Sequence, residues 1–280
     1  MIILRDLEEV QDLIREWKLS SKTIGFVPTM GALHKGHISL VENSKKENDR
    51  TIVSVFVNPT QFNNLEDLEK YPRTEQADAS LLEEAGVDAV FFPTVEVIYP
   101  DGAESEKFNF QGLENQMEGK FRPGHFDGVG TVVKRFFEII QPNKAYFGEK
   151  DFQQLRIIQQ LIQNTRLPIE IVPVPIKRAE NGLALSSRNK RLTPEMLEEA
   201  PKIYQILNKA KDYLQSHTIA ETKSFVEEEF GKTKLKLEYF EIADEETLES
   251  IEELKPGQKI RGFIAVFAGE IRLIDNMALN

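Results

Sequence analysis

The chain has 280 residues and no cysteine, and its 35 Lys and Arg residues against 46 Asp and Glu residues give a formal net charge of −11. This acidic balance disfavours nonspecific binding to nucleic acid or to a membrane surface. The lack of cysteine excludes disulfides, thiolate catalysis and cysteine-ligated zinc. No apolar stretch approaches the ~20 residues of a membrane span, and the amino terminus does not resemble a secretion signal. We therefore expect a cytoplasmic protein with neither nucleic acid nor membrane as a partner.

Short apolar runs alternate with helical patterns over the first two thirds of the chain, which is typical of a parallel sheet covered by helices. Residues 1–9 indicate a short strand that leads into an acidic amphipathic helix. The other predicted strands are Thr23–Val27, Thr51–Val57, Ala89–Phe92, Ala145–Phe147 and Ile169–Val174. The other predicted helices are Ala77–Glu84, Thr131–Ile140 and Phe152–Asn164. Thr94–Pro123 is irregular and carries glycines, which fits a flap and an ordinary surface excursion equally well.

The composition changes near residue 176, where we place a domain boundary. A charged loop, Lys177–Arg191, is our candidate for a lid, and a long helix follows it after the cap Thr193 and Pro194 in the first turn. The remaining predicted elements are a helix around Ala220–Phe230, a strand near Lys236–Ile242, and a hairpin of Ile260–Phe267 and Glu270–Ile274 turning at Ala268–Gly269. The fold class is therefore α/β, with a helix-wrapped parallel sheet in residues 1–176 and a smaller α+β domain in residues 177–280.

The segment Met30–His37 lies between the predicted strand Thr23–Val27 and a helical apolar pattern that begins at Ile38. His34 and His37, three positions apart, share one face of this helix start. The free N–H groups and the dipole of a helix N-terminus attract anions, so both imidazoles can face one phosphate. A His-x-x-His pair can also ligate a metal, but a helical zinc protease needs His-Glu-x-x-His. Phosphate is therefore the preferred interpretation.

Polar residues also follow the predicted strand Thr51–Val57. Ligands of open parallel sheets bind beyond the carboxyl ends of the strands, so these residues are candidates for a binding site. Asn58 and Gln61 come directly after an apolar run. Each amide offers a donor and an acceptor, which suits a ligand with hydroxyls and a carboxylate. Asn58 precedes a proline, however, and this pair alone also favours an ordinary turn.

Three more segments carry charge at predicted corners of the chain. Gly148–Gln154 follows a strand and opens a helix, so Lys150 can meet a phosphate there, although Lys-Asp pairs are usually surface salt bridges. Leu185–Arg188 combines two hydroxyls with a guanidinium, which fits a phosphate clamp or a polar linker. The role of His125, in the predicted turn Arg122–Phe126, is not determined by spacing.

Together these segments resemble known motifs. His34–His37 and Ser186–Arg188 resemble the His-x-Gly-His motif and the Lys-Met-Ser-Lys-Ser-type loop of nucleotidyltransferases related to class I aminoacyl-tRNA synthetases. Further segments extend the resemblance to the pantothenate synthetase (pantoate–β-alanine ligase) family over essentially the whole chain; they are Phe56–Phe62, Tyr71–Arg73, Arg122–Phe126, Gly148–Gln154 and Arg272–Asn276. The resemblance implies a Rossmann-like first domain that binds nucleotide and pantoate, a lid domain and a homodimer. It also implies ATP-dependent joining of pantoate to β-alanine through a pantoyl adenylate, with release of AMP and pyrophosphate and a requirement for Mg²⁺.

The resemblance also implies roles for individual residues. His37 is implied as the acid, and His34, Lys150 and Arg188 are expected to stabilise negative charge with it. The residues implied to bind ATP are Met30, Gly31, Ala32, Leu33, His34, Lys35, Gly36, His37, Gly148, Glu149, Lys150, Asp151, Lys177, Leu185, Ser186, Ser187 and Arg188. Gln61, Gln154 and Asn58 are implied to bind pantoate or β-alanine. Lys35 stands where the family often has an acidic residue, and we expect it to face solvent. Asp78 aligns only loosely with a metal ligand, so the phosphates of ATP are expected to hold Mg²⁺.

Other classes of function stay open. A tRNA-charging enzyme would share the two superfamily motifs, but the tail here is acidic and lacks an evident basic RNA face. Another adenylate-forming acid ligase would share the same activation chemistry. A noncatalytic nucleotide-binding regulator is the last alternative, and turnover with ATP would exclude it.

Overall fold

The computed structural model describes residues 1–62 and 65–280. The chain divides into two compact units. The first unit comprises residues 1–149 and 154–175, and the second comprises residues 150–153 and 176–280. The short segment 150–153 therefore groups with the carboxyl-terminal part of the chain, although it lies far from that part in sequence.

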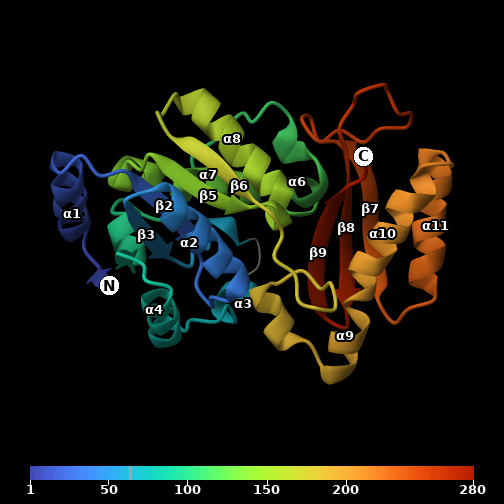
Figure 1. Cartoon of the computed structure of the whole chain (residues 1–280), viewed down its shortest axis with the longest axis horizontal. Helices are drawn as coiled ribbons and strands as arrows, with labels where there is room; N and C mark the ends of the chain where they lie inside the picture. Colours follow the sequence, from blue (N-terminus) through green and yellow to red (C-terminus); the bar gives the residue numbers. More distant parts are fainter. Residues whose placement is uncertain (63–64) are drawn as a thin grey trace. The chain divides into compact units, whose positions relative to one another are not determined.

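The first unit is built on a parallel sheet with helices packed along it (Figure 1). Its strands are β1 (Ile2–Leu4), β2 (Ile24–Thr29), β3 (Arg50–Val55), β4 (Ala89–Phe91), β5 (Lys144–Gly148) and β6 (Glu170–Val174). They lie in the order β1-β4-β3-β2-β5-β6, and every pair is parallel. The predicted α/β class is confirmed, and β2, β3 and β5 place the segments that follow them at one edge of the sheet.

Helices connect these strands. They are α1 (Leu7–Leu19), α2 (Lys35–Glu47), α3 (Leu65–Glu69), α4 (Glu75–Glu84), α5 (Val95–Ile98), α6 (Met117–Phe121), α7 (His125–Ile140) and α8 (Phe152–Thr165), with 3-10 turns η1 (Pro59–Gln61), η2 (Leu113–Asn115) and η3 (Glu149–Asp151). In α1, Val10, Ile14 and Trp17 recur at helical spacing and are buried. In α7, the ring of Phe136 lies 5.7 Å from that of Phe26 on β2, centroid to centroid. Burial of such apolar faces holds the helices on the sheet.

Several predicted boundaries in this unit differ from the structure by one or more residues, and two of these differences lie beside the site. The strand expected to reach Val57 ends at Val55. Helix α7 begins at His125, not at Thr131, so His125 is the first helical residue and not part of a turn. Glycines at 128 and 130 weaken the helical pattern there, but α7 buries a long apolar face that outweighs their low propensity. The segment Thr94–Pro123 is not irregular throughout, because it contains α5, η2 and α6.

The second unit contains an antiparallel sheet in the order β7 (Lys236–Asp244), β8 (Ile260–Ala268) and β9 (Ile271–Ala278). Its helices are α9 (Pro194–Glu199), α10 (Lys202–Leu214) and α11 (Ile219–Gly231), and η4 (Ser187–Arg191) precedes them. Figure 1 shows α10 and α11 side by side along this sheet. Their buried residues, including Ile206 and Val226, form one core with Ile264 of β8. The smaller α+β architecture is thus confirmed.

The structure corrects two details of this unit. The long helix predicted after Thr193 is interrupted, because Pro201 has no N–H to continue α9 and stands as the N-cap of α10. The hairpin turns at Gly269–Glu270, since Ala268 still pairs with Ile271. Strand β9 therefore starts at Ile271 and continues to Ala278, four residues beyond its predicted end.

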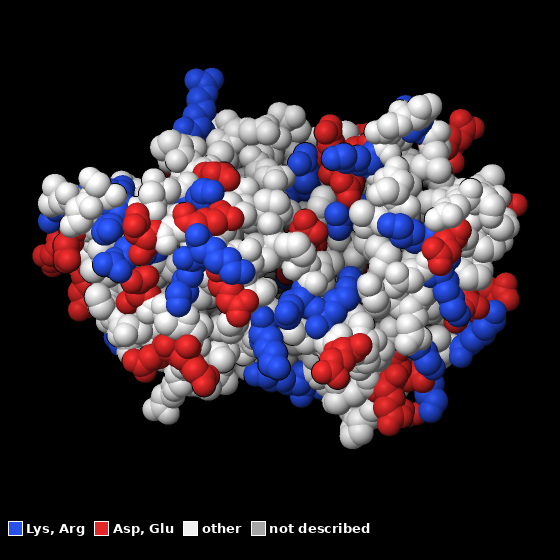
Figure 2. All heavy atoms as spheres, in the orientation of Figure 1, with Lys and Arg blue, Asp and Glu red and all other residues white. Residues whose placement is uncertain are grey.

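On the face drawn in Figure 2, Lys and Arg side chains are interspersed with Asp and Glu side chains. None of the helices within residues 1–62 and 65–280 combines the length and the apolar character that crossing a membrane requires.

Candidate active site

The two histidines of Met30–His37 lie at the start of α2, as predicted. His34 is the N-cap, and its Nδ1 accepts a hydrogen bond from the N–H of Gly36 at 3.1 Å. The Nδ1 of His37 accepts one from the N–H of His34 at 3.3 Å, and the two ring centroids are 4.1 Å apart. Because each Nδ1 accepts, each ring is a neutral imidazole whose proton is on Nε2. Each ring thus carries an Nε2–H donor, and both rings lie in the first turn of α2, a position that favours an anion.

The loop before these histidines has an unusual backbone conformation that Asp78 of α4 stabilises. Gly31 and Ala32 have φ values of 84° and 51°, and alanine rarely adopts this left-handed region. The N–H groups of Ala32 and Leu33 donate to the two carboxylate oxygens of Asp78 at 3.0 and 2.7 Å. Asp78 is 2% exposed, and Thr74 also donates to it, at 3.2 Å. The buried carboxylate thus fixes the approach of the chain to His34.

The amides predicted to bind substrate lie beside this loop. The Nε2 of Gln61, in η1, is 2.7 Å from the Sδ of Met30. Asn58 donates to the Oε1 of Gln61 at 3.1 Å, and its own Oδ1 accepts from the hydroxyl of Tyr99 at 2.8 Å. Burial raises the pKa of Tyr99, so this hydroxyl remains a donor. Within this arrangement Asn58 orients Gln61.

His125 and Arg122 hold the backbone of the same residue. The Nδ1 of His125 lies 2.9 Å from the carbonyl oxygen of Gln61, and a guanidinium nitrogen of Arg122 donates to that oxygen at 3.2 Å. A second nitrogen of Arg122 lies 3.3 Å from the Nε2 of His125. Because Arg122 can only donate, the Nε2 of His125 accepts and its Nδ1–H donates. The imidazole whose role spacing left open therefore anchors Gln61.

The other predicted residues of the first unit follow β5, the neighbour of β2 in the sheet. Gly148 ends β5, Glu149 begins η3, and both are half-buried. Gln154 lies in the first turn of α8 and is also half-buried. Lys35 is exposed, as predicted. The first unit thus supplies the paired imidazoles and Gln61 around the ends of β2 and β3.

The second unit contains the remaining predicted ATP-binding residues. The Nζ of Lys150 is 3.3 Å from a carboxylate oxygen of Asp151. Leu185 donates its N–H to the carbonyl oxygen of Lys177 at 3.0 Å, which brings these two predicted contacts together. The Oγ of Ser186 caps η4 by accepting from the N–H of Arg188 at 3.3 Å. Ser187 is the first residue of η4.

Among residues 1–62 and 65–280, no three His, Asp or Glu side chains converge in a way that would hold a metal ion. Both carboxylate oxygens of Asp78 accept backbone N–H groups. Its observed contacts therefore give Asp78 a structural role.

Comparison with known proteins shows the family to which the chain belongs. The family model of pantoate–β-alanine ligase matches residues 2–278. A pantothenate synthetase from Christiangramia forsetii is 52% identical over 282 residues, with all of both chains covered. The chain belongs to the pantoate–β-alanine ligase family. It is therefore a ligase by family.

Two solved structures extend the comparison with the family. A pantothenate synthetase from Thermus thermophilus matches with a TM-score of 0.92 at 41% identity, covering 100% of this chain and 99% of that one. A pantoate–β-alanine ligase from Francisella tularensis, solved in complex with β-γ ATP and β-alanine, matches with a TM-score of 0.82 at 39% identity, covering 100% and 98%. The fold is thus shared with members of the ligase family over the full chain.

Sequence reasoning missed three features of this ligase. The sequence suggests Asp78 only as a loosely aligned metal ligand, yet in the structure it fixes the loop before His34. The sequence assigns no role to His125 or Arg122, yet both contact the carbonyl oxygen of Gln61. Spacing along the chain gives little sign of these roles, because Asp78 lies 46 residues from Ala32 and His125 lies 64 residues from Gln61.

Proposed function

We propose that this protein condenses pantoate with β-alanine through a pantoyl-adenylate intermediate, releasing AMP and pyrophosphate. The ATP-dependent condensation follows from its membership of the pantoate–β-alanine ligase family. The bound ligands of the Francisella tularensis relative, an ATP compound and β-alanine, support the same substrates here. The pantoyl-adenylate intermediate is proposed because a carboxylate must be activated before an amine can attack it.

A carboxylate is a poor electrophile toward an amine, so pantoate must first be activated. One carboxylate oxygen attacks the α-phosphorus of ATP, and the bond from that phosphorus to the pyrophosphate oxygen breaks. The amine of β-alanine then attacks the acyl carbon, the carbon–oxygen bond to AMP breaks, and the amine loses a proton. In the first step protein groups mainly position the partners and stabilise spreading negative charge.

The observation that carries the proposal is that, in the first unit, the segment of the paired histidines contacts the amide of Gln61. Neutral His34 and His37 present Nε2–H donors suited to phosphate oxygens. Met30, at the start of the same segment, contacts the amide of Gln61. An anion site thus adjoins an amide that can bind the carboxylate and hydroxyls of pantoate. We assign His37 as the acid, and His34 as a stabiliser of the developing charge.

We assign further contacts from the family resemblance. Lys150 and Arg188 are proposed to supply cations to the phosphates. The backbone of Met30–Leu33, Lys35 and Gly36, together with Gly148, Glu149, Asp151, Lys177, Leu185, Ser186 and Ser187, is proposed to bind the rest of the nucleotide. Gln154 is proposed to share pantoate with Gln61, and Asn58 to act through Gln61 because its amide donates to that side chain.

Several properties of the holoenzyme remain proposals. We propose that Mg²⁺ enters on the phosphates of ATP, since phosphate oxygens are ligands that this ion prefers. A homodimer is proposed from the family resemblance. A cytoplasmic location, with no nucleic acid or membrane partner, is proposed from the absence of cysteine and the net charge of −11.

Product analysis tests this function. The purified protein would be incubated with pantoate, β-alanine, ATP and Mg²⁺, and nucleotides and acids would be separated by chromatography. We expect pantothenate and AMP in equal amounts, with no ADP. ADP and phosphate as products would contradict the adenylate, and absence of turnover would favour the noncatalytic alternative. Release of AMP that required tRNA would favour a tRNA-charging enzyme.

A further inference from the structure

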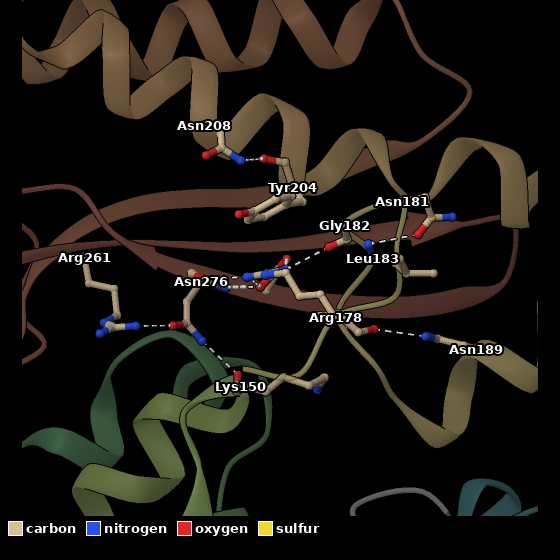
Figure 3. Close-up of polar contacts among 12 residues, drawn as sticks. Lys150, Arg178, Asn181, Gly182, Leu183, Asn189, Tyr204, Asn208, Arg261 and Asn276 are labelled. Atoms are coloured by element: carbon tan, nitrogen blue, oxygen red, sulfur yellow. Dashed lines mark hydrogen bonds and ion pairs between the residues drawn. The ribbon is translucent and has the colours of Figure 1, made fainter. Parts of the chain in front are cut away.

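A buried polar network in the second unit is centred on two adjacent residues of β9, Asp275 and Asn276. They are 4% and 2% exposed. Figure 3 shows that the side chains of Arg178, in the loop after residue 176, and Arg261, on β8, point toward this network, and that the backbone carbonyl of Lys150 meets Asn276. Neither residue belongs to the predicted nucleotide contacts. Burial of a charged and an amide side chain is costly unless each polar atom has a partner, so the partners of this pair are informative.

Asp275 and Arg178 form a bidentate ion pair. The two terminal nitrogens of the guanidinium donate to the two carboxylate oxygens at 2.6 and 2.9 Å. The guanidinium carbon also lies 4.0 Å from the centre of the ring of Tyr204. Stacking and paired hydrogen bonds together fix the plane of the guanidinium, which a lysine at this position would not reproduce.

Arg178 in turn fixes a small hairpin of residues 178–184. Its two ends, Arg178 and Ala184, pair with each other and form what we call the hairpin neck. The side chain of Arg178 donates to the carbonyl oxygen of Gly182 at 3.2 Å. Gly182 has a φ of 92°, and a Cβ there would lie 2.5 Å from the ring of Tyr204, so the turn needs glycine. Beyond the neck, Asn189 donates to the carbonyl oxygen of Ala184 at 3.0 Å. The segment Leu185–Arg188 is therefore held at both of its ends.

Asn276 holds the other predicted nucleotide segment. Its Nδ2 donates to the carbonyl oxygen of Lys150 at 2.9 Å. Its Oδ1 accepts from Arg261 at 2.6 Å, and the guanidinium of Arg261 stacks on the ring of Phe152 at 3.9 Å. Asp275 and Asn276 are also linked directly, because the N–H of Asn276 donates to the Oδ1 of Asp275 at 2.8 Å. The dipeptide thus joins the Lys150 segment to the hairpin neck.

We propose that Arg178, Asp275 and Asn276 are positioning residues that set the arrangement of Lys150 relative to Leu185–Arg188 for nucleotide binding. This inference rests on the proposed function, in which Lys150 and Arg188 bind ATP phosphates. The network binds the backbone of Lys150 and the hairpin neck at Gly182 and Ala184, next to Leu185–Arg188, and it leaves the side chains of Lys150 and Arg188 to act on the ligand. Loss of the ion pair should therefore weaken the use of ATP much more than that of pantoate, whose proposed contacts lie in the first unit.

The test compares Asp275→Asn with a matched control, Glu238→Gln. The control removes the charge from another ion pair of the same sheet, in which the Nε of Arg272 on β9 donates to Glu238 on β7 at 2.7 Å. A second variant, Arg178→Lys, keeps the charge but loses the paired geometry. For each protein the KM for ATP and the KM for pantoate would be measured by pyrophosphate exchange, and thermal unfolding would be recorded.

We expect Asp275→Asn and Arg178→Lys to raise the KM for ATP at least about fivefold and to change the KM for pantoate less than about twofold, as for residues that act at a distance. Glu238→Gln should leave both near the wild-type values. Equal KM values for ATP in Asp275→Asn and Glu238→Gln would overturn the inference. A rise of similar size in the KM for ATP and the KM for pantoate would also overturn the inference. Absence of pantoate-dependent exchange in the wild type would instead contradict the proposed function.

Limited trypsin digestion supplies a readout that does not depend on activity. Arg188, Lys190 and Arg191 lie in η4, beyond the hairpin neck. If the ion pair holds this segment, cleavage there should be several-fold faster in Asp275→Asn than in Glu238→Gln at temperatures where both are folded. Equal cleavage rates would overturn the inference even if a variant proved inactive.

Discussion

Asp78 offers the sharpest test of how the first unit builds its phosphate site. Replacement by Ala would leave the buried N–H groups of Ala32 and Leu33 without acceptors, at ~1–3 kcal/mol each, or ~2–6 kcal/mol together. Since domains are stable by only ~5–15 kcal/mol, that variant would be marginal. Asp78→Asn is the better perturbation, because its single amide oxygen retains one of the two bonds. We expect Asp78→Asn to cost ~1–3 kcal/mol of unfolding free energy.

The matched control is Thr74→Val, which removes only the hydroxyl that donates to Asp78 at 3.2 Å. Its expected cost is about 1 kcal/mol or less. Urea unfolding followed by tryptophan fluorescence is a suitable assay, because the single tryptophan, Trp17, is buried in α1 of the same unit. Pyrophosphate exchange at low urea gives the functional readout, and we expect Asp78→Asn to lose about tenfold, since a loosened loop misplaces His34.

Two outcomes would refute this reasoning. If Asp78→Asn unfolds at the same urea concentration as Thr74→Val, the carboxylate does not stabilise the loop. If it is destabilised but keeps full exchange activity, the conformation of Gly31 and Ala32 does not position the histidines.

Other predictions follow from the same geometry. His34→Ala and His37→Ala should each remain folded and lose about a hundredfold or more in exchange rate, because each removes a donor to developing charge. Near-normal turnover of a folded His37→Ala variant would contradict the assignment of His37 as the acid. Gln61→Leu should weaken the apparent affinity for pantoate while ATP binding persists in calorimetry, because pantoate groups lose partners at ~1–3 kcal/mol each; equal loss of ATP binding would place Gln61 elsewhere. Burial raises the pKa of Tyr146 well above its usual ~10, so its contribution to stability is complete below about pH 10 and declines above it as the unfolded chain ionises. Tyr146→Phe should flatten that alkaline decline in urea unfolding, and an unchanged slope would argue against the burial effect.

The sequence alone predicted those features of the fold that depend on local pattern. The strands around Ile24 and Ala145 and the helix start at His34 follow from apolar runs and glycine positions. The break at Pro201 and the early start of α7 at His125 were missed, because tertiary burial and a single proline outweighed the average helical pattern.

The site divides in the same way between local and distant signals. The paired histidines and the amide of Gln61 lie within short motifs, so their residue types alone predicted their chemistry. Asp78 acts on a backbone 46 residues earlier, and Asp275 on a side chain 97 residues earlier. No periodicity or spacing connects such pairs, because their members are neighbours only in the folded chain.

Isotope exchange between pyrophosphate and ATP tests the central claim most directly. The wild-type protein would be incubated with ATP, Mg²⁺, labelled pyrophosphate and pantoate, with β-alanine omitted. If a pantoyl adenylate forms before the amine attacks, label enters ATP in this mixture and does not enter it when pantoate is also omitted. Exchange that strictly requires β-alanine, or no exchange by a protein that still makes pantothenate, would contradict the adenylate mechanism.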